Sequence, residues 1–451
     1  MPYNKVYKVE LLLEIMEKSE ILNISNDWNF WKKDQDIGII RGDLVEKIRE
    51  LSETKEIVVI KGIRRCGKST SLLQFCKKLI ESGLEKNNIL IINLEDPRFK
   101  NLNLNLLNKI YELYLTELQP NQNHIVILDE VQNIDGWERF ARFLHENKKI
   151  KVFVTGSSSK LLSSEYSSVL AGRHLDLEIK PLSFKEYLLF QNIEIKDNLD
   201  IINKRHSLKS EFKNYLINGG FPKIAITKSE TQRKELLETY FRDIIIKDVV
   251  KRFKIREINK IEDLTKYYLT NVSALQSFNN IKDVLKLNLD TIERFSYYLT
   301  SVFLLNFVKK FSYSEKEQLL NPKKVYCADN GLRNSVAFVF SDDYGKLAEN
   351  LVFNNLNMEN KEIYYWKNKK QEEIDFIIKK KQKIVQLIQV CWNIEKKETE
   401  EREFRALISA CKEFKIKEGL ILTEEIERED KIDGINIIIK PIWKWLLEGK
   451  L

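Results

Sequence analysis

The stretch "VVIKGIRRCGKSTSLLQFCKKL", residues 58 to 79, decides the fold of this 451-residue chain. Together with Ile57 it opens as a short, β-branched, uniformly apolar run, which is typical of a parallel strand buried on both faces. Gly62 and Gly67 then bracket four residues, and apolar residues follow Lys68 at helical spacing. The sequence therefore predicts a strand, a G-x-x-x-x-G-K-[ST] loop and a helix in that order.

This arrangement suits the chemistry of a phosphate chain. Glycines let backbone N–H groups turn inward, and the start of the helix adds positive potential. The lysine reaches the β- and γ-phosphates, and the serine hydroxyl is a ligand for Mg²⁺. The alternative is a glycine-rich turn without a ligand. We predict ATP and Mg²⁺ as ligands, and the loop residues expected to bind them are Gly62, Arg64, Arg65, Cys66, Gly67, Lys68, Ser69 and Thr70.

A second strand supplies the acids that such a site needs. The stretch "HIVILDEVQNI", residues 124 to 134, is an apolar run that ends in Asp129 and Glu130. We expect Asp129 to join Ser69 at the metal, through water, and Glu130 to orient or deprotonate the attacking water. An acid pair that merely opens a solvated loop is the alternative. Glu130 and Lys68 are accordingly predicted to be catalytic.

Two later motifs extend this prediction. The stretch "IKVFVTGSSSKLL", residues 150 to 162, predicts a third strand with hydroxyls from Thr155 to Ser159 at its tip, and Ser157 is the predicted nucleotide contact. These serines are equally suited to cap the next helix. Arg173 follows a glycine turn in "LAGRHLDLEIK". It either neutralises transition-state charge, in its own or a neighbouring subunit, or simply begins a strand as an exposed arginine.

Composition sets wider limits. The length predicts roughly two to four domains, and 43% hydrophobic residues are enough for packed cores. The formal charge of +8 permits a nucleic-acid partner without requiring one. Five cysteines, without a CxxC pair, predict reduced thiols and a cytoplasmic protein. No apolar run is long enough to span a bilayer, so no membrane association is expected.

Beyond about residue 180 the apolar period becomes helical. A helical lid is predicted, interrupted by the turn "NGGFP" at residues 218 to 222. Residues 260 to 313 then read as three short helices and a strand, which fits a winged helix. Its recognition helix would be capped by Asn288 or Asp290. The outward residues expected on this helix are Thr291, Glu293 and Arg294. Because that face is not notably basic, DNA contact and protein docking both stay open.

These motifs carry a family resemblance. G-x-R-R-x-G-K-S-T, "ILDE", "TGSSSKLL", "LAGR" and "PLSFKEYL" occur in this order, followed by "YLINGGFP", "KKVYCADNGLR", "AENLVFNNL" and "EIDFII". The chain resembles the AAA-type predicted ATPases that are widespread in archaea and bacteria. The resemblance implies a ring or another nucleotide-dependent homo-oligomer, such as a hexamer, with Arg173 as its leading finger candidate. It also favours a role in ATP sensing for Arg64 and Arg65, which otherwise face nucleotide, a neighbouring subunit or acids of the lid.

The C-terminal portion resembles the PD-(D/E)xK nuclease core. Glu349 on a helix and Asp375 in a strand would be its carboxylates, but the following motif reads Gln389-Val390-Cys391. Cysteine cannot replace the ammonium of a lysine, although Lys381 or Lys383 are candidates to take over that role. We therefore expect a nuclease-like fold that has lost or severely weakened cleavage. Without the resemblance, Glu349 and Asp375 would have no assigned role.

The predicted fold class is α/β, with a P-loop NTPase core of the AAA type. The expected segments are an N-terminal lead-in at 1–40, the ATPase core at 41–180, the helical lid at 181–258, the winged helix at 259–320 and the nuclease-like domain at 321–451. Two functions compete. One is an ATPase that binds or acts on DNA, including branched DNA, and the other is a signalling or scaffold ATPase whose nucleotide state controls docking to a protein.

Overall fold

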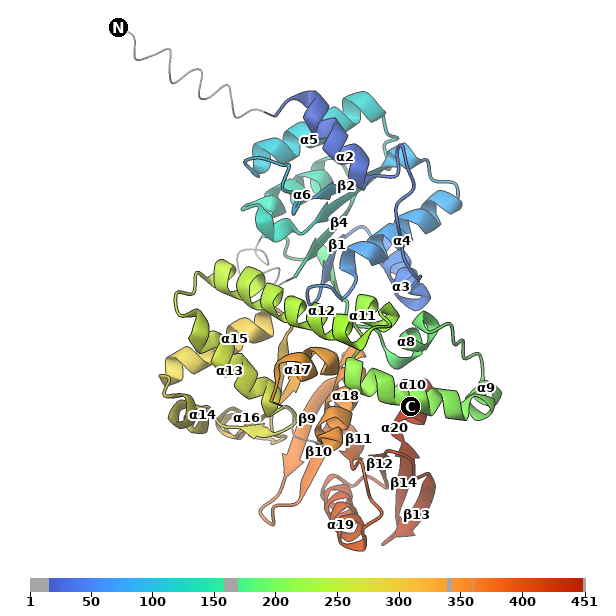
Figure 1. Cartoon of the computed structure of the whole chain (residues 1–451), viewed down its shortest axis with the longest axis vertical. Helices are drawn as coiled ribbons and strands as arrows, with labels where there is room; N and C mark the ends of the chain where they lie inside the picture. The colour runs from blue at the N-terminus through green and yellow to red at the C-terminus, as the bar shows by residue number, and fades with distance from the viewer. Residues whose placement is uncertain (1–15, 158–168, 339–342, 360, 449–451) are drawn as a thin grey trace. The chain divides into compact units, whose positions relative to one another are not determined.

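The computed structural model describes residues 16–157, 169–338, 343–359 and 361–448 (Figure 1). The chain divides into two compact units. Unit 1 comprises Met1–Ile63 and Gly67–Ile179, and unit 2 comprises Arg64–Cys66 and Lys180–Leu451. The division into five segments stays a prediction.

Unit 1 is built on a parallel five-stranded sheet with the strand order β2-β3-β4-β1-β5. Its strands are β1 (Ile57–Lys61), β2 (Ile89–Asn93), β3 (Ile125–Asp129), β4 (Lys151–Gly156) and β5 (His174–Glu178). The first four residues of β1 are buried, as predicted for a strand covered on both faces. β4 pairs with both β1 and β3, so the third predicted strand lies between the other two.

Helices cover both faces of this sheet. They are α2 (Lys18–Trp28), α3 (Gly42–Ser52), α4 (Lys68–Glu81), α5 (Leu104–Leu118) and α6 (Trp137–Asn147), with short 3-10 turns η1 (Lys86–Asn88) and η2 (Val131–Asn133). α2, α5 and α6 lie on one face, and α3 and α4 lie on the other (Figure 1). Strand side chains alternate between the faces. Val59 joins the core of the first face, whereas Phe153 packs on Phe75 of α4 at a centroid distance of 5.3 Å.

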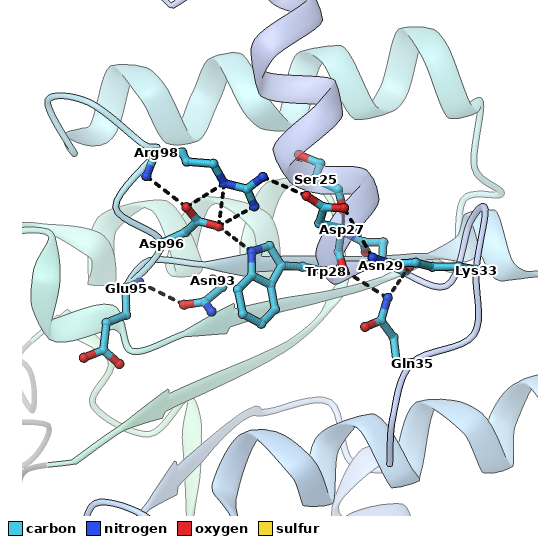
Figure 2. A network of polar contacts seen from close by, with 10 residues as sticks. All are labelled: Ser25, Asp27, Trp28, Asn29, Lys33, Gln35, Asn93, Glu95, Asp96 and Arg98. Atoms are coloured by element: carbon cyan, nitrogen blue, oxygen red, sulfur yellow. Dashed lines mark hydrogen bonds and ion pairs between the residues drawn. The ribbon is translucent and has the colours of Figure 1, made fainter. Parts of the chain in front are cut away.

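The lead-in segment is part of unit 1, and Figure 2 shows its polar contacts with the segment that follows the edge strand β2. The Asn29 side chain accepts a bond from Ile91 N at 2.7 Å and donates one to Ile91 O at 2.9 Å, as a neighbouring strand would. Trp28 Nε1 donates to Asp96 Oδ2 at 2.7 Å, and Arg98 pairs with that same carboxylate. Edge strands expose unpaired backbone groups, and at β2 the lead-in satisfies some of them.

Unit 2 begins with helices, as predicted for a lid. They are α8 (Phe184–Phe190), α9 (Asn198–Asn203), α10 (Arg205–Asn218), α11 (Pro222–Ile226) and α12 (Glu230–Asp243), and α12 continues into the π-helix η4 (Ile244–Lys251). α10 ends at the predicted "NGGFP" turn, and Pro222 begins α11. Proline suits the first position of a helix because its missing N–H would have no helical partner there.

Four helices and a small antiparallel sheet follow. They are α13 (Ile258–Thr270), β6 (Leu275–Gln276), α14 (Phe278–Leu285), α15 (Leu289–Ser301), β7 (Leu305–Val308), α16 (Glu315–Leu320) and β8 (Lys323–Cys327), with the strand order β6-β8-β7. The third strand lies beyond residue 320, where the sequence predicted this segment to end. Asn288 is the N-cap residue of α15, as predicted, although its side chain makes no capping hydrogen bond, and Asp290 lies in the first turn. Glu293 and Arg294 are exposed and Thr291 is half-buried.

The C-terminal part of unit 2 contains a mixed six-stranded sheet with the order β13-β14-β12-β11-β10-β9. Its elements are α17 (Asn330–Val336), α18 (Tyr344–Met358), β9 (Glu362–Lys367), β10 (Glu373–Lys380), β11 (Lys383–Val390), α19 (Lys397–Phe414), β12 (Glu418–Thr423), β13 (Arg428–Ile432), β14 (Ile435–Pro441) and α20 (Ile442–Glu448). β9, β10 and β11 form the predicted antiparallel meander. Throughout the part of the chain that the structure describes, helices are too short or too polar to cross a bilayer.

Candidate functional site

The glycine-rich loop connects β1 to α4. Gly62 and Gly67 have φ angles of 151° and 101°, a backbone region that side chains with a Cβ rarely adopt. Lys68 begins α4 and is buried. Its ammonium turns back into the loop, where Nζ donates to Gly62 O at 3.1 Å and to Ile63 O at 3.4 Å. The loop thus gathers backbone groups and one cation at the carboxyl edge of the sheet.

Ser69 and Asp129 meet at this edge, as the sequence predicted. Ser69 Oγ donates to Asp129 Oδ1 at 2.9 Å. Thr155, from the end of β4, donates its hydroxyl to the same carboxylate oxygen. Thr155 Oγ1 also accepts the backbone N–H of Glu130 at 3.0 Å. One threonine hydroxyl therefore holds both members of the acid pair.

Glu130 has an unusual backbone for a residue with a side chain. Its φ of 58° and ψ of 50° lie in the left-handed region, which is strained for non-glycine residues and is often found at functional sites. Its carboxylate accepts a hydrogen bond from the side chain of Gln132 and lies 3.9 Å from Lys68 Nζ. Glu130 is also buried. The end of β3, the side-chain amide of Gln132 and the ammonium of Lys68 therefore position the Glu130 carboxylate together.

The electrostatics of the acid pair favour a cation. Burial and the neighbouring charge of Glu130 raise the pKa of Asp129 to about 6, although hydrogen bonds from Thr155 and Ser69 oppose this shift. Hydroxyl and carboxylate oxygens are the hard ligands that Mg²⁺ prefers. The donor set therefore fits Mg²⁺ held by Ser69 and Asp129. Across the described residues there is no cluster of three or more histidine, cysteine or acidic side chains that could hold a metal, so phosphate and water oxygens would complete the shell.

The two loop arginines contact acids of unit 2, to which Arg64–Cys66 belong. Arg64 pairs with Asp248 of η4 through two bonds of 3.0 and 3.2 Å, and both side chains are almost fully buried. The Arg65 guanidinium lies 3.9 Å from Asp243 and 5.7 Å from the centroid of the Tyr240 ring. Of the orientations left open by the sequence, the structure shows the one toward acids of the helical region.

Arg173 does not lie at this site within the chain. Its backbone oxygen accepts the N–H of Ile57, at the start of β1, at 2.9 Å. β1 and β5 run parallel, so Arg173 lies at the amino edge of the sheet, about 16 Å along the strands from the loop at Gly62. Its side chain pairs with Glu146. Action of Arg173 on nucleotide in its own subunit is therefore not supported, and action across subunits stays a prediction.

The hydroxyl cluster after β4 is only partly described. Ser157 is fully buried, and Ser158 and Ser159 lie outside the described residues. Thr155 makes the contacts with Asp129 and Glu130. The sequence places Thr155 at the strand tip, but neither Thr155 nor Gln132 was predicted as a site residue. One feature of the sequence points to Thr155. It is the last polar residue of a buried strand, and that strand lies beside β3, which carries Asp129.

A second cluster of charged residues lies in unit 2. Lys324 Nζ is 2.6 Å from Asp375 Oδ1, 2.9 Å from Glu373 Oε1 and 3.0 Å from Glu349 Oε1. Tyr326 also donates to Glu349 Oε1, at 2.7 Å. Burial and the charge of Asp375 raise the pKa of Glu349 to about 8. The structure thus brings Glu349 and Asp375 together, as the resemblance implied, around a lysine that the sequence analysis did not predict.

Gln389 adjoins this cluster through Asp375. Gln389 Oε1 accepts the backbone N–H of Asp375 at 3.1 Å, and its amide donates to Glu403 at 2.7 Å. Burial and the charge of Glu403 raise the pKa of the Cys391 thiol to about 12. Lys383 pairs with Lys380 at the end of the hairpin, five residues from Asp375, so about 17 Å of strand separates the hairpin lysines from the acids. The expected takeover by Lys381 or Lys383 is therefore wrong.

Comparisons with known proteins identify three family matches along the chain. Residues 54–188 match the family described as AAA domain, and residues 209–343 and 344–445 match two domains of unknown function, DUF8612 and DUF4143. An uncharacterized protein of Methanocaldococcus jannaschii is 34% identical over 87% of this chain and 88% of its own length. An uncharacterized protein of Haemophilus influenzae is 27% identical over 91% of this chain and 99% of its own.

Solved structures show a more distant likeness. A Walker-type ATPase of Pyrococcus abyssi is 16% identical, with a TM-score of 0.42, over 68% of this chain and 99% of that one. The Orc1 protein of Aeropyrum pernix, solved in complex with DNA, is 11% identical, with a TM-score of 0.30, over 71% of this chain and 96% of that one.

Proposed function

We propose an ATPase function from the premise that the chain belongs to the family of proteins that join an AAA domain to the DUF8612 and DUF4143 domains. One observation carries the proposal. Ser69 of the glycine-rich loop and Thr155 of β4 both donate to Asp129, and Thr155 also accepts the N–H of Glu130. The loop and the acid pair therefore form one connected site.

Each residue of this site has a task in ATP hydrolysis. Backbone N–H groups of the loop would bind the phosphates, and Lys68 would exchange its carbonyl partners for phosphate oxygens. Ser69 and Asp129 would hold Mg²⁺, which neutralises phosphate charge when bound. Glu130 would orient the attacking water and accept its proton. Gln132, which donates to Glu130, limits the directions in which that carboxylate can point.

Two substitutions test this assignment. Lys68→Ala should abolish ATP binding in a calorimetric titration, whereas Lys77→Ala, a change at a more exposed lysine of the same helix, should leave it unchanged. Glu130→Gln should bind ATP but almost stop phosphate release, because the change keeps the shape and removes the charge. Normal ATP binding by Lys68→Ala, or normal turnover by Glu130→Gln, would contradict the proposal.

We also propose that the active form is a nucleotide-dependent homo-oligomer in which Arg173 acts on the site of a neighbouring subunit. The position of Arg173 at the amino edge of its own sheet supports this, since it is too far from its own loop. Mixtures of Arg173→Ala and Glu130→Gln subunits should then show activity that departs from simple dilution. A chain that stays monomeric with a non-hydrolysable ATP analogue would exclude the model.

For the partner of the ATPase we propose DNA, with branched DNA among the forms to be tested. The excess of positive charge supports this choice. The ATPase rate with single-stranded, duplex and four-way-junction DNA tests it, and binding should weaken steeply with salt because bound phosphates release counterions. The mixed charges of Glu293 and Arg294 on α15 favour the second candidate, nucleotide-controlled docking to a protein. If DNA neither binds the protein nor changes its ATPase rate, docking to a protein becomes the better-supported function.

The C-terminal domain is proposed to bind without cleaving nucleic acid. The reason is that an internal ammonium, that of Lys324, occupies the centre of the carboxylates. Incubation with junction and flap DNA in Mg²⁺ or Mn²⁺ should leave the DNA intact. Cleavage that disappears in Asp375→Ala would overturn this proposal and leave the ATPase assignment untouched.

A further inference from the structure

A hollow of about 660 Å³ in unit 2 has an unusual lining. It lies between the segment after β7, the β10–β11 hairpin and the segment after α19. The residues used below are Phe311, Tyr313, Tyr364, Lys379, Lys383 and Lys415, and we call the site they form the lysine–tyrosine hollow. Among the described residues that line it there is no aspartate or glutamate. Three ammonium groups therefore face one space that carries no carboxylate of its own.

The aromatic side chains of the hollow form a fixed platform. Phe311 is buried, and its ring meets those of Tyr364 and Phe414 edge-on at centroid distances of 5.7 and 5.3 Å. Tyr313 packs against the same phenylalanine at 5.3 Å, yet 88% of Tyr313 is exposed. An exposed aromatic ring offers a surface on which a flat ligand can stack. The Tyr313 ring is therefore accessible to such a ligand.

The lysines of the hollow have little competing charge. Lys379 is paired with Glu362 at 2.8 Å. In the described part of the chain, no ion pair is formed by Lys383 or Lys415. Both side chains reach solvent, so their ammonium groups are available to a ligand without loss of an internal partner. An anion that enters the hollow would gain charge-assisted hydrogen bonds.

A second hollow, of about 480 Å³, extends the surface on the other side of Tyr313. It shares Phe311, Ser312 and Tyr313 with the first and adds Lys310, Lys367 and Lys369. Its two acids serve local bonds: Glu317 accepts the Ser312 hydroxyl at 2.7 Å, and Glu413 accepts Trp366 Nε1 at 3.2 Å. Lys367 pairs with Glu373 at 3.2 Å. Both hollows therefore combine lysines with the shared Tyr313, which suits a ligand longer than one residue.

We propose that the lysine–tyrosine hollow binds a single-stranded nucleic acid, with bases stacked on Tyr313 and Tyr364 and phosphates held by Lys379, Lys383 and Lys415. Single strands offer an aromatic face and a phosphate in every unit, which matches alternating rings and lysines. A duplex keeps its bases stacked inside, and an acidic peptide would use the lysines without covering the tyrosine. The inference rests on the nucleic-acid part of the proposed function and is independent of ATP hydrolysis.

Fluorescence anisotropy with a labelled oligothymidylate of about 15 nucleotides tests the proposal on the full chain. The double change Lys383→Glu with Lys415→Glu should lower the affinity at least tenfold and reduce its salt dependence. Tyr313→Ala should lower the affinity roughly tenfold because a base loses its stacking partner, whereas Tyr313→Phe should keep it. Lys397→Glu, at a lysine of α19 outside the hollow, is the control for added negative charge.

Four results would overturn the inference. Equal loss of affinity in Lys397→Glu would show a general charge effect. Unchanged affinity in the Tyr313→Ala and lysine variants would mean that the nucleic acid binds elsewhere on the protein, and the DNA proposal would then still stand. Competition by polyglutamate as effective as that by the oligonucleotide would identify an acidic-peptide site. If the parent binds no nucleic acid in any form, both the inference and the DNA proposal fail. ATP turnover of the parent and variants, measured without DNA, reports separately on the ATPase.

Discussion

Lys324 and Asp375 form a buried ion pair in which Nζ lies 2.6 Å from Oδ1. Lys324 comes from β8 of the three-stranded sheet and Asp375 from β10 of the six-stranded sheet, so the pair joins the two sheets of unit 2. Burial alone would favour a neutral lysine, but attraction to Asp375 and Glu349 raises the pKa of Lys324 well above its ordinary value. An ammonium that stays charged here supplies the cation that the clustered carboxylates require.

Replacement of the Lys324 ammonium should make the stability of the folded protein depend on an added cation. In Lys324→Met the carboxylates of Glu349, Glu373 and Asp375 lose their shared partner, and breaking a buried pair in this way costs about 3–5 kcal/mol. We expect a large drop in the thermal midpoint of unfolding that millimolar Mn²⁺ partly restores, because a divalent cation would take the position of the ammonium. Thermal unfolding with and without MnCl₂ measures both effects.

The neighbouring lysine is the control for that experiment. Lys323 lies on the same strand but is only half-buried, over the ring of Phe278. Lys323→Met should change the midpoint little and should give no stabilisation by Mn²⁺ beyond that of the parent. If Mn²⁺ stabilised the parent and Lys324→Met to the same extent, the ammonium would not occupy a cation position.

The hydroxyl of Thr155 is expected to control the acid pair of the proposed ATPase site. Thr155→Val keeps the size of the side chain but removes the donor to Asp129 and the acceptor of the Glu130 N–H. A buried N–H without a partner costs about 1–3 kcal/mol, so we expect phosphate release to slow at least tenfold while ATP still binds. Thr155→Ser retains the hydroxyl and should keep most of the activity. Equal rates for the valine and serine variants would remove Thr155 from the site.

Unit 1 was largely predictable from local patterns. The strand at Ile57, the loop from Gly62 and the acids at Asp129 each lie in a short motif, and parallel strands bring their carboxyl ends to one edge. The same rule places Arg173, which precedes β5, at the opposite edge, so only its action across subunits stays a prediction. The role of Thr155 depended on the position of β4 between β1 and β3, which no local pattern states.

Unit 2 was predictable in its elements but not in its chemistry. The meander and the place of Glu349 on a helix follow from periodicity and resemblance. The contact of Lys324 with Glu349 joins residues 25 positions apart on different elements, and buried lysines are rare enough that none is expected in advance. The exposure of Tyr313 depends on how the segment after β7 packs, which a single sequence does not reveal.

Gly219 is expected to tolerate no side chain. Its φ of 77° is strained for other residues, and a Cβ would lie 2.1 Å from Asp329 Oδ1. That carboxylate accepts the N–H of Gly220 at 2.6 Å, so it cannot move away without losing a buried bond. Gly219→Ala should therefore lower the stability of unit 2 by at least about 2 kcal/mol. Gly345→Ala, in the open on α18, should be neutral or slightly stabilising in the same unfolding assay.

The carboxyl group of Asp329 should make the stability of unit 2 depend on pH. Burial raises its pKa to about 6, although the N–H groups of Gly220 and Leu332 oppose the shift. An aspartate in the unfolded chain has a pKa of about 3.9. Between these values the folded state binds more protons than the unfolded state, so the contribution of Asp329 to stability falls as pH rises from about 4 to about 6. The full change is about 3 kcal/mol, since each pKa unit corresponds to 1.36 kcal/mol.

Asp329→Asn isolates this one group from the other acids of the chain. The amide does not titrate, so the difference in unfolding free energy between the parent and the variant should shift in favour of the variant from pH 4 to pH 6 and then level off. The absolute difference also contains the loss of one acceptor, because the amide nitrogen cannot accept the N–H of Gly220. The pH trend is therefore the informative quantity, measured by denaturant titrations across this range. A difference that stays constant would mean that Asp329 is already ionised at pH 4, and that its backbone hydrogen bonds outweigh its burial.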